Sequence, residues 1–507
     1  MDKVPNRGLI TVCAMVSTLM QALDSTIANV ALPYMQGSLS ATGDQITWVL
    51  TSYIVAAAIM TAPVGWLSTR FGRKPLFLTC LIGFTVTSML CGVAQSLTQM
   101  VVFRVLQGVF GAALVPLSQS TMLDIYPPEQ RGSAMAIWGM GVMVGPILGP
   151  TLGGYLTDLY DWRWVFYVNL PFGILATAGL LLFLPRSEPK PGMRFDSLGF
   201  GVLALGIGAF QLMLDRGQDQ DWFGSREIIV EAVLGALGLY LFVVHLMTAE
   251  KPFLSPRLFR DRNLSVSLAI MFSVGMILLA SSALLAPWLQ TLAGFPVATA
   301  GLVLAPRGFG TMAAMMVSGR LAGRIDPRKL MALGIALLSY SLWTMTGWTP
   351  DVSIPTILVN TIIQGAGLGF VFIPLQVVAF ATLPPDLRTD GTSLLSLLRN
   401  VGSAVGVSAC SALLARNAQI SHADLVAGVT PFNPAYPPGA PVGALLSPAT
   451  PKGAAMLDAM VNHQAAIIAY LDDFKAMLLV TLPSVLLLLL MRRPAPAKVD
   501  PAHAAME

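Results

Sequence analysis

Two stretches of the chain share a pattern of residues at the same spacing. Residues 107–131 read QGVFGAALVPLSQSTMLDIYPPEQR, and residues 364–388 read QGAGLGFVFIPLQVVAFATLPPDLR. Both begin with Gln-Gly and end with Pro-Pro, an acid and an Arg at the same spacing, and the copies lie 257 residues apart. In a membrane protein, such a repeat indicates two parallel halves related by an axis along the membrane normal.

The composition shows that this repeat belongs to a membrane protein. Of 507 residues, 55% are hydrophobic and only 11% are charged, and the mean hydropathy is +0.70. A soluble chain carries about 25% charged residues, so this chain has too few to coat a water-facing surface of its size. The net charge of +4, without a basic patch that alternates with aromatic residues, gives no support to nucleic-acid binding.

The sequence predicts neither a cofactor nor a metal. The four cysteines lie inside apolar runs at spacings that match no metal site and suggest no disulfide framework, and the four histidines do not cluster. A phosphate-cradling GxxxxGK[ST] loop is absent, which disfavours ATP-driven transport within this chain. No nucleophile and base are grouped as in an enzyme, so we expect a protein without catalytic activity.

Long apolar runs recur along the chain. A bilayer core of about 30 Å needs roughly 20 apolar residues per helix. We predict an all-α polytopic membrane protein with two six-helix halves, at residues 1–190 and 263–507, and two inserted linker helices at 191–262. The fourteen spans are expected near residues 9–32, 46–69, 76–95, 98–122, 133–157, 163–184, 196–214, 227–247, 264–292, 298–322, 328–348, 353–380, 389–415 and 474–491.

The basic residues predict the orientation. Cytoplasmic loops keep an excess of Lys and Arg, and most of the 30 fall on the cytoplasmic side when the N-terminus is placed there. Both termini are then cytoplasmic. One segment expected outside, residues 416–473, is rich in Pro, Ala and Gly and is far longer than the other external loops. A tolerated solvated insertion and a docking surface are equally good interpretations of it.

Five motifs occur in a fixed order along the first half of the chain. They are LDSTIANVALP at 23–33, GWLSTRFGRKPLF at 65–77, Arg104 with Gln107-Gly108, the glycines of 141–154, and WRWVFYVNLPFG at 162–173. Together they resemble the motifs of the major facilitator superfamily and, within it, of the fourteen-helix drug/proton antiporters of the EmrB type. The resemblance covers essentially the whole chain. It implies multidrug efflux in exchange for protons across a bacterial inner membrane.

Asp24 is the only carboxylate that we place deep inside a predicted span. An ionised group in hydrocarbon costs at least about 2.5 to 3.5 kcal/mol, so an acid at this position indicates a function. Asp24 and Arg104 lie about eight and seven residues from the outer ends of their helices, or roughly 12 and 10 Å, which allows them to meet at one depth. We expect this pair to couple proton movement to transport. A static ion pair that holds two helices together is the alternative.

Other polar residues are expected to line a substrate cavity. Arg307 and Arg399 fall roughly 15 Å into their spans, near the midplane where transporter sites form. If they and Arg104 face the cavity, its cationic interior favours anionic or neutral lipophilic substrates, unless helix-end carbonyls take up an arginine. The glutamines donate hydrogen bonds either to a ligand or to neighbouring helices. The cavity set is Gln21, Asn29, Gln107, Arg307, Gln364 and Arg399.

The loop motif after the second span predicts an inner gate. Its residues are Gly65, Arg70, Gly72, Arg73 and Lys74. The glycines permit a tight turn, and the cations lie where helix dipoles and acids of the other half can hold the gate closed. An equally good interpretation is that these cations only fix the orientation of the helices in the membrane. The family's usual Asp in this motif is Thr69 here, so the family's charge pairing cannot be carried over intact.

Repeated glycines mark the fifth predicted span, which resembles the antiporter motif of exporters. The motif comprises Gly141, Gly145, Pro146, Gly149, Pro150, Gly153 and Gly154. Glycines remove side-chain bulk so that backbones can approach and slide, and the proline can kink the helix. Tight packing alone is the alternative interpretation.

The best functional hypothesis is a proton-coupled exporter of lipophilic, neutral or weakly acidic small molecules. A dedicated exporter of one metabolite, lipid or siderophore is the second hypothesis, and a non-transporting membrane sensor or assembly platform is the third. The resemblance to EmrB-type proteins implies a periplasmic adaptor and an outer-membrane channel as partners. We expect the segment 416–473, with PFNP at 431–434, to be the adaptor contact.

Overall fold

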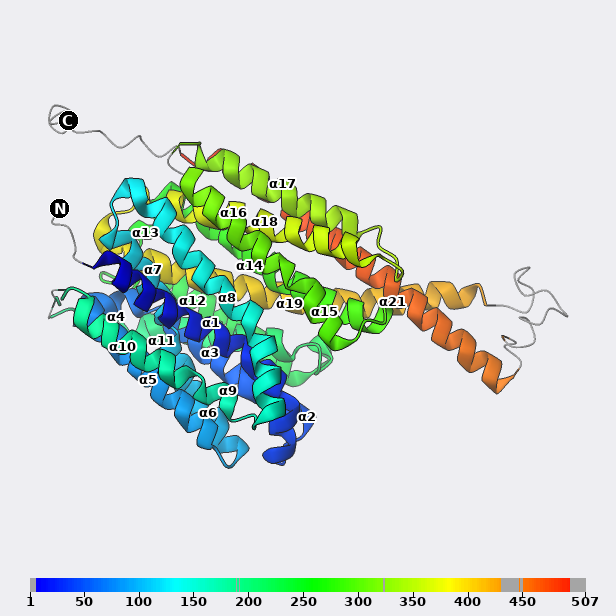
Figure 1. The fold of residues 1–507 in the computed structure, drawn as a ribbon. Coiled ribbons are helices and arrows are strands. Elements are labelled where there is room, and N and C mark those ends of the chain that lie inside the picture. The colour runs from blue at the N-terminus through cyan, green and yellow to red at the C-terminus, as the bar shows by residue number, and fades with distance from the viewer. Residues whose placement is uncertain are drawn as a thin grey trace.

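The computed structural model describes residues 6–187, 189–190, 192–321, 324–429, 446 and 450–492. In these residues the chain is a bundle of helices that run largely side by side, and α1 begins at the end of the bundle where the last helix, α22, ends (Figure 1). Twelve helical spans among the described residues are long and apolar enough to cross a membrane, and one bent pair makes a thirteenth. The predicted all-α polytopic fold is confirmed.

The first half of the chain forms six spans. A 58° bend separates α3 from α4, at Pro63, because proline cannot continue the hydrogen-bond ladder of a helix. Ser96 caps α6 by accepting a hydrogen bond from the backbone N–H of Gln99. The elements are α1 (Arg7–Ser38), α2 (Gly43–Ile46), α3 (Trp48–Thr61), α4 (Val64–Phe71), α5 (Arg73–Val93), α6 (Leu97–Gly111), α7 (Leu114–Ile125), η1 (Pro128–Gln130), α8 (Arg131–Leu159), α9 (Trp164–Tyr167) and α10 (Asn169–Phe183).

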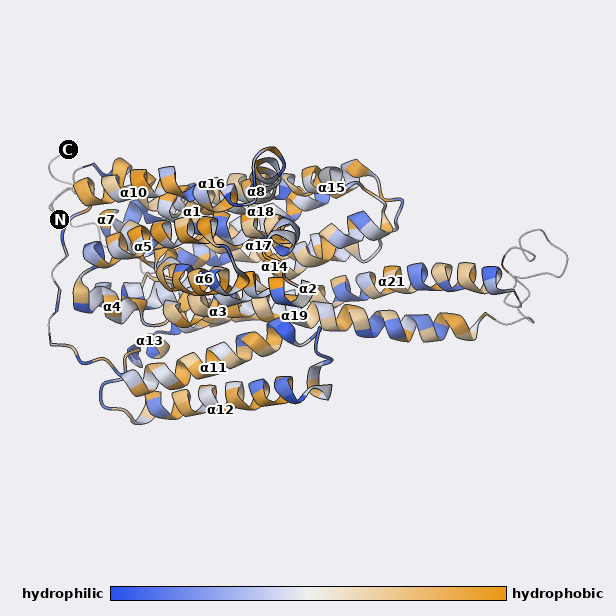
Figure 2. Ribbon diagram, turned by 90° about the horizontal axis from the view of Figure 1, so that it is seen from below, coloured by the Kyte–Doolittle hydropathy of each residue, from blue (hydrophilic) through white to orange (hydrophobic). Residues whose placement is uncertain are grey.

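Two further spans, α11 (Ser197–Arg216) and α12 (Arg226–Thr248), lie together to one side of the bundle (Figure 2). They cross closely at a pair of glycines, since a Cβ atom on Gly238 would lie 2.6 Å from the backbone nitrogen of Gly206. α11 packs against α3 and α19, while α12 packs mainly on α11. This is the arrangement expected of helices inserted between two halves.

The second half repeats the order of the first. After α18 a 3₁₀ turn, η4, leads into α19, which begins at Arg388, just as η1 leads into α8 at Arg131. The predicted span 328–348 corresponds to α17, which packs against α18 and α21, so the fourteen-span count is consistent with the structure. The elements are α13 (Arg257–Arg260), α14 (Arg262–Pro287), η3 (Trp288–Leu292), α15 (Val297–Leu304), α16 (Pro306–Leu321), α17 (Pro327–Met345), α18 (Ile354–Ala379), η4 (Pro385–Leu387), α19 (Arg388–Ala427), α21 (Pro451–Thr481) and α22 (Ser484–Leu490).

The two halves meet along two seams. α8 packs against α16 and α18, and α19 packs against α3, α4 and α7. The outer surface is apolar: Leu182, Met247 and Leu489 are 73%, 81% and 75% exposed. Side chains of this kind are stable on the outside of a bundle when lipid surrounds it.

Much of the segment 416–473, expected to be a loop, is helical instead. α19 continues to Ala427, α21 begins at Pro451, and the two project beyond the bundle as a helical hairpin (Figures 1 and 2). Gly453, Leu457 and Val461 are buried at every fourth position of α21, a spacing that places them on one helix face. The PFNP sequence at 431–434 lies outside the described residues.

Candidate functional site

Asp24 is the centre of a fully buried polar network. Its Oδ2 atom accepts a hydrogen bond from Nη1 of Arg104 at 2.7 Å, and its Oδ1 atom accepts from Nε2 of Gln107 at 2.8 Å. Nη1 of Arg104 also donates to Oε1 of Gln107 at 2.7 Å. Asp24 and Arg104 are both 0% exposed. The two residues expected to meet at one depth therefore do so, in an ion pair removed from solvent.

The rest of the N-terminal half holds the Arg104 guanidinium in place. Its Nε atom donates to the carbonyl oxygen of Val49 at 2.9 Å, and its central carbon lies 4.2 Å from the centre of the Tyr53 ring. The Tyr53 hydroxyl accepts a hydrogen bond from Nε2 of Gln21 at 3.3 Å. Contact with a carboxylate, a carbonyl and an aromatic face fixes the planar guanidinium in one orientation.

Asn169 is a member of this network that sequence reasoning did not assign to it. Its Nδ2 atom donates to Oδ1 of Asp24 at 3.2 Å and to Oγ of Ser88 at 3.0 Å. Ser88 donates in turn to the carbonyl oxygen of Phe166. The available signal was an amide side chain at the first residue of the apolar helix α10, inside one of the five motifs.

The remaining predicted cavity residues do not join the Asp24 network. Arg307 of α16 donates from Nη1 to Oγ of Ser282 at 2.7 Å and from Nη2 to the carbonyl oxygen of Leu278 at 3.1 Å. A carbonyl from the interior of α14, and not from a helix end, thus accepts a hydrogen bond from this arginine. Arg399 of α19 is half-buried, and its backbone is in close contact with Gly275 of α14.

Gln364 and Asn29 complete the predicted cavity set. Gln364 is 0% exposed, and neither atom of its side-chain amide has a hydrogen-bond partner among the described residues. Its counterpart in the repeat, Gln107, bonds both members of the ion pair. Asn29 is exposed on α1 and does not contact the network. The six residues therefore belong to separate environments in the two halves.

The glycines of α8 form the contact surface with α1. A Cβ atom on Gly145 would lie 2.8 Å from the backbone nitrogen of Leu23, next to Asp24. Gly141, Gly149 and Gly153 likewise face α1, against Met15, Thr26 and Ile27, whereas the nearest atom to a Cβ on Gly154 belongs to Val30 at 4.0 Å. Both Pro146 and Pro150 lie within α8, and their side chains are not among those that the structure describes.

The other side of α8 contacts the second half of the chain. A Cβ atom on Gly139 would lie 2.9 Å from Sδ of Met315 on α16, and the Trp138 and Phe372 rings stack at 6.4 Å. α8 is therefore packed between the second half and α1, the helix that carries Asp24.

A second polar cluster joins the halves at the end of the bundle where α1 begins. Arg73 forms an ion pair with Asp124, and Asp124 also accepts a hydrogen bond from Nη1 of Arg388 at 2.7 Å. Nη2 of Arg73 donates to Oγ1 of Thr389 at 3.4 Å. Gly72 has φ +87°, a conformation that glycine adopts without strain. Sequence reasoning identified Arg73 but missed Asp124 and Arg388 as its partners across the seam.

Thr69, which replaces the family's Asp, turns back on its own helix. Its Oγ1 atom donates to the carbonyl oxygen of Gly65 at 3.0 Å. The carboxylate beside Gly65 comes instead from Asp390 of α19, which occupies the space that a Cβ atom on Gly65 would need. The acid at this contact is thus supplied by the other half of the chain.

The remaining two cations of the loop motif do not reach the seam. Nζ of Lys74 donates to the carbonyl oxygens of Leu181 and Leu184, at 2.8 and 2.6 Å, at the end of α10. Arg70 is half-buried and forms no ion pair with a described acid. For these two residues the structure fits anchoring of helix ends better than gating.

Asp24 is not the only acid buried within the spans. Asp473 of α21 is also 0% exposed. The predicted span began at residue 474, so this acid was placed in a loop. The helix instead runs through both adjacent acids: Asp472 points outward to Lys475 at 2.8 Å, and Asp473 points inward. Successive residues of a helix point about 100° apart, which allows one acid to be solvated and the next buried.

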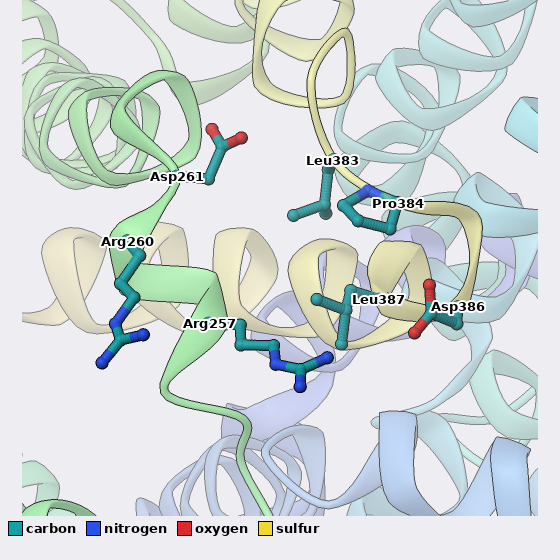
Figure 3. A pocket seen from close by; sticks show the side chains of 7 residues that line it. All are labelled: Arg257, Arg260, Asp261, Leu383, Pro384, Asp386 and Leu387. Carbon is teal, nitrogen blue, oxygen red and sulfur yellow. The ribbon is translucent and has the colours of Figure 1, made fainter.

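A surface pocket of about 380 Å³ lies apart from these clusters, where α13 meets the connection between α18 and α19 (Figure 3). Arg257, Arg260 and Asp261 line one side, and Leu383, Pro384, Asp386 and Leu387 line the other. Asp261 accepts a hydrogen bond from Thr382 at 2.6 Å, which ties the two walls together. The lining contains as many arginines as aspartates, and its other residues are leucine and proline, so the pocket has no marked net charge.

Comparison with known proteins gives the chain its family. The family model of the Major Facilitator Superfamily matches residues 14–407. The chain is 37% identical to the multidrug export protein EmrB of Escherichia coli (strain K12) over 433 residues, which are 84% of each chain. It is 36% identical to the fatty acid resistance protein FarB of Neisseria gonorrhoeae over 439 residues, 85% of this chain and 86% of that one.

A solved structure supports the same assignment at the level of the fold. The proton:xylose symporter XylE superposes with a TM-score of 0.59 at 13% identity, covering 99% of both chains. At such low identity, the similarity indicates a shared fold and says nothing about the substrate. The family model, the identity to EmrB and the superposition agree: the chain belongs to the major facilitator superfamily and, within it, to the family of the EmrB-type multidrug export proteins.

Proposed function

We propose that this transporter exchanges protons for lipophilic small molecules and exports the latter across the bacterial inner membrane. The observation that carries the proposal is the buried network in which Asp24 bonds Arg104, Gln107 and Asn169. As a member of a transporter family the chain is not an enzyme, so these charged groups have no catalytic reaction to serve.

The network supplies a means of coupling. While Arg104 contacts Asp24, the carboxylate is stable in its ionised form. A buried carboxylate that loses its cationic partner takes up a proton, because an isolated charge is costly in a dry interior. A movement of α1 along the glycine surface of α8 would shift Asp24 relative to Arg104, because Arg104 lies on a different helix, α6. Substrate binding that favours such a movement would link protonation of Asp24 to transport.

Proton flux from purified protein in liposomes tests the proposal. A pH gradient is imposed, lipophilic compounds are added, and a lumenal pH dye reports proton movement for wild type, Asp24→Asn and Asp158→Asn. Asp158 is the control, because it is an exposed acid on α8 that bonds Tyr34. We expect substrate-dependent proton movement in wild type and in Asp158→Asn but not in Asp24→Asn.

Substrate-dependent proton movement that persists in Asp24→Asn would assign coupling to another group. Its absence from wild type with every compound would favour a dedicated exporter of one compound or a non-transporting role.

We further propose that neutral or weakly acidic lipophiles are the preferred substrates. None of the described acids forms an ion pair with Arg307 or Arg399, so two cations in the second half are left without a carboxylate. FarB, whose name records fatty acid resistance, supports this preference. Binding of a fatty acid, a neutral lipophile and a quaternary cation of similar size provides the test. Preferred binding of the cation would contradict the proposal.

The projecting hairpin is our proposed contact with a periplasmic adaptor, in a tripartite pump completed by an outer-membrane channel. α19 has 40 residues. At 1.5 Å per residue that is roughly 60 Å, about twice the thickness of the membrane core. Deleting residues 425–465 should abolish adaptor capture and leave insertion and substrate binding unchanged. Capture at the wild-type level by the deletion variant would rule out this contact.

A further inference from the structure

Asp473 is a buried acid that the proposed mechanism does not use. It lies in α21 with no solvent exposure. Neither of its carboxylate oxygens has a hydrogen-bond partner among the described residues. Asp24, at the same degree of burial, has three donors. Among the described residues, Asp24 and Asp473 are thus both fully buried, but only Asp24 has hydrogen-bond partners.

Asp473 lies beside a hydrophobic cluster that includes its helix neighbours Tyr470, Phe474 and Met477. Two titratable side chains lie in the cluster around it, Tyr470 on α21 itself and Cys410 on α19, and neither is a cation. The other buried cluster members from α14, η3, α17 and α21 are Ile277, Ala280, Leu284, Leu285, Trp288, Leu289, Leu342, Met345, Phe474 and Met477. None of the described cations forms an ion pair with Asp473, and the nearby Lys475 pairs with Asp472 instead.

This environment determines the charge of Asp473. An ionised carboxylate without a partner in a low-dielectric interior is so costly that the group binds a proton instead. A neutral carboxylic acid, in contrast, is tolerated in such a cluster. These surroundings favour the protonated form of Asp473, whereas Asp24 has its charge compensated by Arg104.

Counting residues along the helices places Asp473 at a depth similar to that of Asp24. Asp24 is 17 residues from Arg7, where α1 begins, and Asp473 is 17 residues from Leu490, where α22 ends. At 1.5 Å per residue both acids are roughly 26 Å from the end of the bundle that these two helix termini share. Protons bound at these two acids would therefore be held at a similar depth in the membrane.

α19 connects Asp473 to the cluster at the seam between the halves. Cys410 of α19 lies in the cluster around Asp473, while Arg388 at the start of the same helix bonds Asp124. If the seam opens, α19 loses contacts with α3, α4 and α7 and can shift against α21. A shift that admits water to Asp473 permits its ionisation and the release of its proton.

From these observations we propose that Asp473 is a second proton-binding site of the transport cycle, located in the C-terminal half and loaded in the conformation described. The proposal rests on the proposed proton exchange and adds a carrier to it. Asp24 alternates between Arg104 and a proton, while Asp473 alternates between a dry cluster and water.

Infrared spectroscopy of the full chain in lipid tests the loaded state directly. A protonated carboxyl group has a carbonyl stretch that is distinct from that of a carboxylate. We expect this band in wild type, in Asp24→Asn and in the matched control Asp472→Asn, and a loss of intensity in Asp473→Asn. Asn has the shape of the neutral acid, and Asp473→Glu keeps the carboxyl group, so the Glu variant should retain the band. A spectrum unchanged by Asp473→Asn would overturn the proposal.

Counting protons exchanged per substrate molecule in liposomes tests the role in transport. Asp473→Asn should exchange fewer protons than wild type and still bind substrate, while Asp472→Asn and Asp473→Glu should match wild type. An unchanged count in Asp473→Asn refutes this proposal alone and leaves coupling at Asp24 intact. Absence of substrate-dependent exchange from wild type refutes both this proposal and the proposed function, which separates the two failures.

Discussion

At the residue scale, each charge of the ion pair between Asp24 and Arg104 is stable only while the other is present. Both side chains are shut off from solvent, so neither charge recovers its hydration if the other is removed. Breaking a buried pair leaves an uncompensated charge and is strongly destabilising, whereas removing both charges is often nearly neutral. Single and double variants of this pair therefore separate the effect of its charges on stability from the effect of its packing.

We expect Arg104→Gln to lower the free energy of unfolding by about 3–5 kcal/mol, because it leaves the Asp24 carboxylate without a cation. The double variant Asp24→Asn with Arg104→Gln should recover most of this loss. Denaturant unfolding in detergent measures both. Equal losses in the single and double variants would show that packing of the guanidinium, and not its charge, accounts for the cost.

The residues around this pair also show what a sequence can and cannot reveal. Asp24 and Arg104 were found because charges within apolar runs are rare, and their depths follow from helix rise alone. Asn169 carries no charge, and nothing in its spacing relates α10 to α1. Asp473 lies at an uncertain span boundary, and only the direction in which each side chain points distinguishes it from Asp472. Side-chain direction and the pairing of helices are properties of the folded bundle.

At the element scale, the glycines of α8 differ in how closely they approach α1. Gly145 has no room for a side chain against the backbone of Ala22 and Leu23, whereas a Cβ atom on Gly154 would come no closer than 4.0 Å to Val30. The same substitution should consequently have opposite effects at these two positions, although both glycines belong to one motif.

Gly145→Ala should destabilise the transporter by about 1–3 kcal/mol through overpacking and should slow transport, because it pushes α8 away from α1. Gly154→Ala should raise stability by up to about 1 kcal/mol, because alanine favours the helix. Thermal unfolding and substrate efflux by each variant provide the comparison. Similar effects at both positions would indicate that helix propensity, and not contact with α1, determines the result.

The cluster at the seam permits a prediction about α19 and its neighbours. Asp124→Asn removes the acid shared by Arg73 and Arg388, and we expect the halves to separate more often at this end. Thr392 is fully buried at the seam and donates to the carbonyl oxygen of Pro116, so a cysteine at 392 reports opening through its rate of thiol labelling.

Labelling of Thr392→Cys, in a background without the four native cysteines, should be several-fold faster with Asp124→Asn. Asp386→Asn nearby, at an exposed acid, serves as the control. A rate unaffected by Asp124→Asn would mean that apolar packing alone holds this seam closed.

At the scale of the whole molecule, the repeat predicted the architecture better than it predicted the ends of the spans. Two stretches 257 residues apart are followed by the same succession of 3₁₀ turn and helix. The hairpin of α19 and α21 was missed, because Pro, Ala and Gly were interpreted as a loop composition although buried residues recur at every fourth position of α21. Helical periodicity was the better guide there.

The shared position of the first and last helix ends leads to a topology prediction. A fluorescent protein fused to the C-terminus should fluoresce and be protected from external protease, because we expect that end in the cytoplasm. Alkaline phosphatase inserted after Gly428, in the hairpin at the opposite end of the bundle, should be active. An inactive phosphatase together with an external C-terminus would reverse the orientation and change the side on which substrate is collected.

The position of Asp390 has a consequence for hybrids between relatives. In this chain the acid beside Gly65 comes from α19, and the loop motif carries Thr69 where the family has Asp. A chimera that joins the first half of a relative with that Asp to the second half of this chain would bring two carboxylates together across the seam. The first half of this chain, which carries Thr69, is therefore suited to a second half that supplies Asp390.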